Sequence, residues 1–222
     1  MLLAVDTSTT QVGVALYDGH RVIGESLWHG KLRHTTSLAP EIDALFKRTK
    51  TTMDDVTALG VALGPGSFTS LRVGLALIKG LALARHLPLI GIPTLDILAA
   101  AQPVRENQLA AVLQAGRGRL AVGYYTATPK GFWEPDGDLS VMRVDELTEK
   151  ITIETRVCGE LNEEERNTLR KNEMVRLSSP SRSTRRPACL AELAWKRYQA
   201  KNTDDAASLS PIYLQVGAKI PS

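Results

Sequence analysis

The residues Gly64 to Gly74, which read Gly-Pro-Gly-Ser-Phe-Thr-Ser-Leu-Arg-Val-Gly, combine glycines and hydroxyl groups as phosphate-binding loops do. An apolar run precedes this motif and a long apolar segment follows it, which predicts a strand, a turn and a helix whose free N–H groups bind anions. A P-loop, however, has Lys and then Ser or Thr after its second glycine, and this motif has neither. We therefore predict a turn in which the Ser67 hydroxyl caps the helix by accepting a backbone N–H.

A second polar turn, Asp6-Thr7-Ser8-Thr9-Thr10, follows the first apolar run. The Asp6 carboxylate could hold a nucleotide-bound metal, and the hydroxyls could donate to phosphate. Such side chains also bond to nearby backbone in ordinary turns, and this interpretation is favoured. A second glycine-containing segment, residues 114–119, supplies glycines and arginines but no carboxylate for a metal. We predict no bound cofactor.

Other catalytic patterns are also missing. The four histidines, His20, His29, His34 and His86, are scattered and lack the spacing of metal ligands. Ser67 lies outside a Gly-x-Ser-x-Gly elbow, which argues against a serine peptidase. We expect no catalytic residue and no metal ligand.

Basic residues near the C-terminus could contact the phosphates of a nucleic acid: Arg182, Arg185 and Arg186, with Lys196 and Arg197 after them. Aromatic residues that would stack on bases are not interleaved with them, so a solvated loop is favoured. Charge over the 222 residues is nearly balanced, with 27 Lys and Arg against 24 Asp and Glu. This balance is no nucleic-acid signature by itself.

Composition also bounds the location. The two cysteines, Cys158 and Cys189, form no disulfide framework, which favours a reducing cytoplasm. No apolar run reaches the roughly 18 residues of a membrane helix, so we expect no membrane partner.

Hydrophobic periodicity predicts an α/β unit in the first hundred residues. The expected order is three strands, a helix, a strand, a helix and a strand, at 2–5, 12–17, 21–28, 36–50, 58–63, 67–85 and 87–92. Three antiparallel strands followed by α/β crossovers predict a mixed sheet flanked by helices.

A boundary is expected near Gln102-Pro103, beyond which the chain is more polar. We place one lobe at 1–102 and a smaller lobe at 103–205, with 206–222 returning to the first. The second lobe is expected to contain strands at 109–113, 120–125 and 151–158, and helices at 162–171 and 187–201.

The helix that follows the Gly64–Gly74 motif is apolar nearly all round. Such a helix must be covered on more than one side. The sheet covers one side, and the other is either covered within the chain or exposed as a patch for a partner. The residues alone leave both alternatives open.

Several motifs together resemble the TsaB (YeaZ) family, which has two actin-like (ribonuclease H-like) α/β lobes, the second reduced. The motif Gly64–Gly74 is the most specific; the others are Leu3-Ala4-Val5-Asp6-Thr7-Ser8, His34 before Leu-x-Pro, Gly91-Ile92-Pro93-Thr94-Leu95 and Pro211-x-Tyr213-Leu214. Two departures stand out. Ser70 replaces a usual Gly, and residues 114–119 lack both acidic residues of the family's Asp-Ala-Arg-x-Gly-Glu.

The resemblance implies a non-catalytic scaffold that binds a TsaD-like catalytic subunit, together with a TsaE-like ATPase. This complex would threonylcarbamoylate the adenosine next to the tRNA anticodon, with tRNA reached only through the complex. It also implies a homodimer when the chain is alone. Pairing would use the two apolar helices through Leu38, Ile42, Leu45, Leu71, Val73, Gly74, Leu77, Ile78 and Leu81. The alternatives are an active actin-like ATPase and a glycoprotease-like peptidase.

Overall fold

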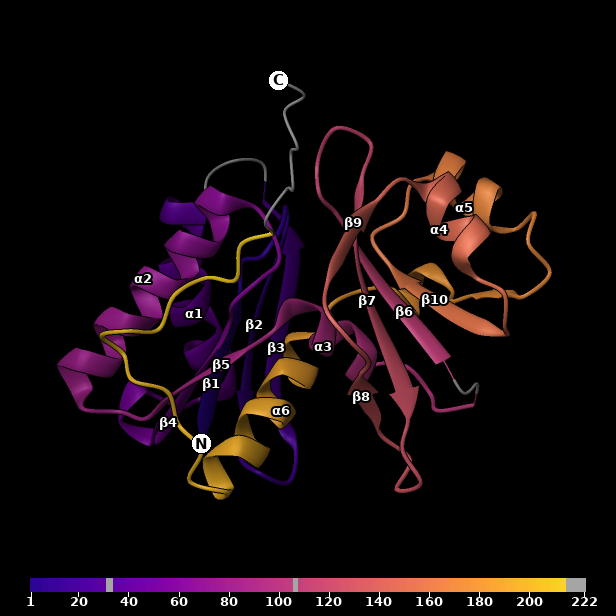
Figure 1. Ribbon diagram of the computed structural model, residues 1–222. Helices are drawn as coiled ribbons and strands as arrows, with labels where there is room; N and C mark the ends of the chain where they lie inside the picture. Colours follow the sequence, from indigo (N-terminus) through magenta and orange to yellow (C-terminus); the bar gives the residue numbers. More distant parts are fainter. Residues whose placement is uncertain (31–33, 106–107, 215–222) are drawn as a thin grey trace.

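Five strands form the first sheet in the order β3-β2-β1-β4-β5 (Figure 1). The computed structural model describes residues 1–30, 34–105 and 108–214. Strand β2 is antiparallel to both of its neighbours, β1 and β3, whereas β1, β4 and β5 run parallel to one another. The strands are β1 (Leu2–Asp6), β2 (Gln11–Tyr17), β3 (Val22–His29), β4 (Ala58–Ala62) and β5 (Leu89–Ile92).

Helices cover both faces of this sheet. Helices α1 (His34–Thr49) and α2 (Phe68–Arg85) pack on one face, where Leu3, Val5 and Leu59 are buried. Helix α6 (Pro187–Gln199) packs on the opposite face. Every residue of β1 and β4 is therefore buried, as expected for parallel strands between two helical layers.

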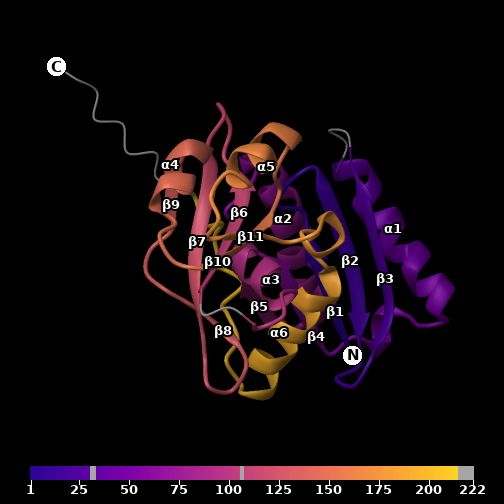
Figure 2. The same cartoon turned by 90° about the vertical axis from the view of Figure 1, so that its right-hand side faces the viewer.

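The second sheet has the order β11-β10-β6-β7-β8, and β9 also pairs with β7. Its strands are β6 (Gln108–Gln114), β7 (Leu120–Ala127), β8 (Trp133–Pro135), β9 (Ser140–Met142), β10 (Thr155–Gly159) and β11 (Val175–Leu177). Helices α4 (Val144–Lys150) and α5 (Glu163–Leu169) lie close together on this lobe, as Figure 2 shows from the side.

Helix α3 (Thr94–Ala100) connects the lobes. Its buried residues Leu95, Leu98 and Ala99 pack on β6 and β7, and the helix also contacts α6. Two single 3-10 turns, η1 (Met53–Asp55) and η2 (Pro180–Arg182), complete the regular structure of the described residues.

The predicted element order of the first hundred residues is confirmed. The strand expected at 151–158 begins only at Thr155, and α3, α4, β8, β9 and β11 were not predicted. Helix α6 falls in the range assigned to the second lobe, yet Leu190, Ala191 and Ala194 bury it against the first sheet. The segment expected to return to the first lobe is described only to residue 214.

None of the helices in the described ranges combines the length and apolarity that crossing a membrane requires.

Candidate functional site

The turn at Gly64 does not offer the Ser67 N–H to a phosphate, because that group is already used within the chain. Gly64 adopts a positive φ of 110°. The Ser67 N–H donates to the Ser8 carbonyl at 2.6 Å, so the turn closes onto the turn that follows β1. A Cβ at Gly66 would collide with the same carbonyl.

The cap prediction for Ser67 is wrong in its hydrogen bond. Ser67 occupies the N-cap position of α2, but its side chain accepts no backbone N–H. Its hydroxyl accepts instead from Ser70 Oγ at 3.1 Å. Ser70 therefore competes for the group expected to cap the helix.

Asp6 at the end of β1 is buried and already fully engaged. The Ser8 N–H donates to Asp6 Oδ1 at 2.8 Å, which is the local backbone bond expected for such a turn. The other oxygen, Oδ2, accepts from Arg185 Nε at 2.8 Å. This second partner lies 179 residues away in the sequence and was not predicted.

Arg185 is fully buried and bridges the two lobes. Its Nη2 donates to Thr9 Oγ1 and to the Gln11 carbonyl, both at 2.8 Å, and its Nη1 donates to Glu160 at the end of β10. Burial alone would lower the pKa of Arg185, but the carboxylates of Asp6 and Glu160 raise it above its ordinary value. Neither a solvated loop nor contact with tRNA phosphate fits this residue, because its guanidinium neutralises two carboxylates inside the protein.

The neighbouring arginines behave differently. Arg182 is exposed, as predicted for a solvated loop. Arg186 is exposed as well, and its guanidinium forms a bidentate contact with Glu25 on β3.

A cleft of about 790 Å³ lies between the lobes. Its walls include Thr9 and Thr10, residues 65–68 and residues 113–116. Gln114 donates to the Glu165 carboxylate at 2.8 Å and so turns toward α5. Over the described ranges, no group of three or more His, Cys, Asp and Glu is arranged to hold a metal. A magnesium nucleotide does not fit these residues, because the guanidinium of Arg185 stands where Asp6 would face the metal.

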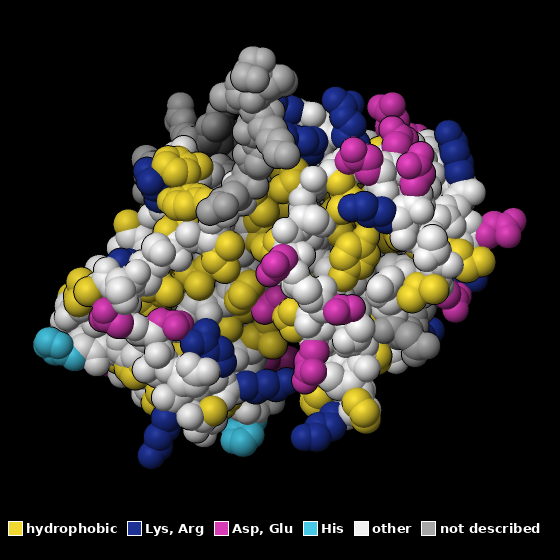
Figure 3. All heavy atoms as spheres, in the orientation of Figure 1, with side chains coloured by type: hydrophobic (Ala, Val, Ile, Leu, Met, Phe, Trp, Pro, Cys, Tyr) yellow, Lys and Arg dark blue, Asp and Glu magenta, His cyan; other side chains and the backbone are white. Residues whose placement is uncertain are grey.

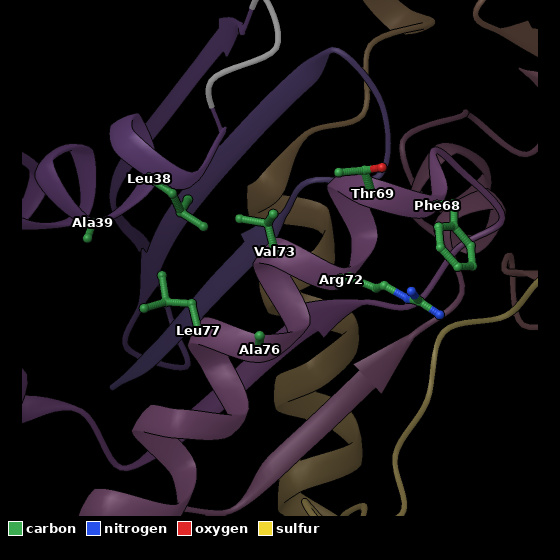
Figure 4. A pocket seen from close by; sticks show the side chains of 8 residues that line it. All are labelled: Leu38, Ala39, Phe68, Thr69, Arg72, Val73, Ala76 and Leu77. Atoms are coloured by element: carbon green, nitrogen blue, oxygen red, sulfur yellow. The ribbon is translucent and has the colours of Figure 1, made fainter.

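An apolar groove of about 490 Å³ runs between α1 and α2. In Figure 4 the side chains of Leu38, Val73 and Leu77 point toward one another across it. Ala76 is small and exposed, so the α2 backbone is open to close approach there. The groove is lined by Leu38, Ala39, Phe68, Thr69, Arg72, Val73, Ala76 and Leu77.

The structure separates the predicted interface residues into two sets. Val73, Leu77 and Leu81 are half-buried, and the first two line the groove. The other six are buried in the first lobe, although Leu38 still contributes to the groove floor: Leu38, Ile42, Leu45, Leu71, Gly74 and Ile78. Gly74 is packed so closely against Thr7 that a Cβ at this position would collide with the Thr7 hydroxyl.

The residues after α6 return along α2, as the yellow trace in Figure 1 shows. Lys79 Nζ donates to the carbonyls of Ala207 at 3.2 Å and Leu209 at 3.0 Å. At one end of the groove the Arg72 guanidinium stacks 3.6 Å from the centre of the Phe68 ring, and its Nε donates to the Tyr213 hydroxyl at 3.0 Å. No sequence pattern predicts this cluster, since Arg72 and Tyr213 are 141 residues apart.

A family model described as "TsaD: tRNA N6-adenosine threonylcarbamoyltransferase" matches residues 30–131. The tRNA threonylcarbamoyladenosine biosynthesis protein TsaB of Escherichia coli is 31% identical over 156 residues, which cover 68% of this chain and 65% of that protein. TsaB of Buchnera aphidicola subsp. Schizaphis graminum is 28% identical over 153 residues, which cover 68% of this chain and 72% of that protein. The matched part of the chain thus spans roughly two thirds of these relatives.

The fold itself matches over nearly the whole chain. The solved structure of YeaZ from Pseudomonas aeruginosa superposes with a TM-score of 0.79 over 96% of this chain and 99% of that one, at 24% identity. This likeness shows the fold, which is a pair of actin-like α/β lobes. Taken with the matching curated relatives, it shows that the chain belongs to the TsaB (YeaZ) family.

Proposed function

We propose that this chain is a non-catalytic scaffold in the formation of threonylcarbamoyladenosine in tRNA, and that it binds a TsaD-like catalytic subunit through the groove between α1 and α2. The curated relatives carry the name of this biosynthesis. The observation that carries the scaffold role is the exposed apolar groove itself. A TsaE-like ATPase and the tRNA would join through the complex.

The groove has the features of a protein interface. Val73 and Leu77 supply an apolar centre, and Ala76 lets a partner helix approach closely. Phe68 and Arg72 lie at one end of the groove, and 52% of the Phe68 surface is exposed. Aromatic and arginine side chains are enriched in interfaces and supply many of their strongest contacts. An amphipathic helix laid between α1 and α2 would cover this surface.

The residues around the interlobe cleft favour a scaffold role rather than ATPase activity. Asp6 is paired with a buried guanidinium, so the group that would face a metal is already neutralised. The peptidase alternative has no support either, since the Ser67 hydroxyl contacts Ser70 and, in the part of the chain that the structure describes, no histidine. Magnesium-dependent nucleotide binding that disappears in Asp6→Ala would favour the ATPase instead.

Substitution of Val73 by Asp tests the interface. Binding of the same organism's TsaD-like protein is measured by isothermal titration calorimetry. A charge buried without a partner costs about 3–5 kcal/mol, so we expect affinity to fall by a hundredfold or more. Leu77→Asp should act in the same way.

Ala84→Asp is the matched control, because Ala84 is exposed on α2 and does not line the groove. Circular dichroism and thermal unfolding establish that each variant is folded. Unchanged affinity in folded Val73→Asp would contradict the assignment. Sedimentation of the chain alone, with and without Val73→Asp, shows whether the same groove pairs two copies.

A further inference from the structure

A third cleft, of about 590 Å³, lies between α3, α6 and the hairpin that connects β7 and β8. It shares no lining residue with the α1–α2 groove or with the 790 Å³ cleft between the lobes. Figure 3, in the orientation of Figure 1, shows hydrophobic side chains gathered in the hollow between the lobes with acidic side chains beside them. The proposed scaffold role makes no use of this cleft.

One wall of the cleft carries a carboxylate with a free oxygen. Asp96 on α3 is half-buried, and its Oδ1 accepts from the Tyr125 hydroxyl at 2.7 Å. Within the described ranges, Oδ2 accepts no hydrogen bond and no cationic side chain lies within ion-pair distance of Asp96. Burial raises the pKa of Asp96, which is the cost of holding this carboxylate away from water without a counter-charge.

Aromatic rings form much of the remaining wall. Tyr125, Phe132 and Trp133 line the cleft, and the Trp133 indole donates to the Gln102 carbonyl at 3.3 Å. The chain already places one cation on this surface, since Lys196 Nζ lies 4.7 Å from the centre of the Phe132 ring. Aromatic faces attract ammonium and guanidinium groups in this way.

We infer that this cleft binds a ligand with an ammonium or guanidinium group on an apolar stem, with the cation on Asp96 Oδ2 and the stem against the aromatic wall. A charge-assisted bond to a partly desolvated carboxylate supplies the specificity. A metal ion is a poor fit, because the described residues bring no second and third ligand to Asp96. An anion is disfavoured, because the described lining carries three carboxylates, Asp96, Glu134 and Glu192, against the single cation of Lys196.

Matched probes test the inference on the full chain. Phenethylamine and the neutral 2-phenylethanol differ in charge and share a stem. Binding is followed by the NMR shift of the Trp133 indole N–H, assigned with Trp133→Phe. We expect the amine to bind at least tenfold more tightly, and Asp96→Asn to weaken it by about ten- to a hundredfold while leaving the alcohol unaffected.

Two further variants separate binding from misfolding. Lys196→Gln removes a competing positive charge and should tighten the amine by a fewfold, a gain that misfolding would not produce. Asp138→Asn, at an exposed position outside the cleft, should have no effect. Acetyl-arginine amide is the third probe. If it binds more tightly than phenethylamine, the natural ligand is a basic side chain of a peptide or protein. If phenethylamine binds more tightly, the natural ligand is a small free amine.

Equal shifts with the amine and the alcohol would overturn the inference. An amine affinity that Asp96→Asn leaves unchanged would also overturn it. So would the absence of any shift with all three probes at 10 mM, because a Kd of that size corresponds to only about −3 kcal/mol of binding free energy.

Discussion

Arg185→Met should destabilise this protein more than any other single change to a charged residue in the described ranges. The guanidinium is fully buried and contacts Asp6, Thr9 and Gln11 in the first lobe and Glu160 in the second. Methionine keeps much of the apolar stem but removes the charge. Asp6 is then left buried, with only the Ser8 N–H to stabilise its carboxylate.

The expected cost follows from two opposing terms. Opposite charges about 4 Å apart attract by about 4 kcal/mol at an effective dielectric constant of about 20. Desolvation costs several kcal/mol per ion, so the intact pair roughly breaks even. Removing Arg185 deletes the attraction and leaves the desolvation of Asp6, which predicts a loss of about 3–5 kcal/mol. Total stability of a domain is about 5–15 kcal/mol, so this change is large.

Urea unfolding followed by circular dichroism measures this loss. Arg186→Met is the matched control, because it makes the same substitution at the next residue, where the side chain is 53% exposed and pairs with Glu25. An exposed pair contributes about 0–1 kcal/mol, so the control should lie within that range. The variant Asp6→Asn/Arg185→Met should recover about 2 kcal/mol relative to Arg185→Met, since no buried charge remains unpaired.

Two results would refute this reasoning. One is an Arg185→Met protein within about 1 kcal/mol of the parent, which is the range of an exposed pair. The other is strict additivity of Asp6→Asn and Arg185→Met, which would mean that the two groups do not interact.

Two further perturbations have matched readouts. Gly74→Ala should lower the free energy of unfolding by about 1–3 kcal/mol, because the added Cβ collides with Thr7. Gly80→Ala has open space around it and should raise the free energy of unfolding by about 0.5–1 kcal/mol. Urea unfolding measures both changes, and equal effects would contradict the packing of Gly74 against Thr7. Burial raises the pKa of Cys158 from 9.0 to about 12, so the thiolate forms first in the unfolded chain. Stability should then fall above pH 9 by up to about 1.4 kcal/mol per pH unit more than in Cys158→Ala, and parallel pH profiles of the two proteins would refute this.

The first lobe could be predicted because its signals are local. The two helices predicted there are long, with 16 and 18 residues, the strands are continuous or alternating apolar runs, and glycine or proline marks several of the turns between them. The elements that were missed are short: α3 has seven residues and follows Pro93, while β8, β9 and β11 have three each. Such segments gain their stability from neighbours rather than from their own pattern.

The candidate interface could be predicted only in part. The apolar character of α2 correctly indicated a helix covered on more than one side. Which of its side chains remain open depends on how α1 lies beside it, so Leu71 and Ile78 are buried while Val73 and Leu77 line the groove. No pattern within α2 distinguishes these pairs.

The sequence by itself determined the order of elements in the first lobe, the absence of a P-loop lysine and the resemblance to TsaB proteins, because each rests on neighbouring residues. Only the tertiary structure decided that Arg185 closes on Asp6, that Tyr213 reaches Arg72 and that Asp96 meets Tyr125. These contacts join residues 179, 141 and 29 positions apart, respectively. Burial and charge pairing act on distances in space, and the chain sets those distances only once both lobes have packed.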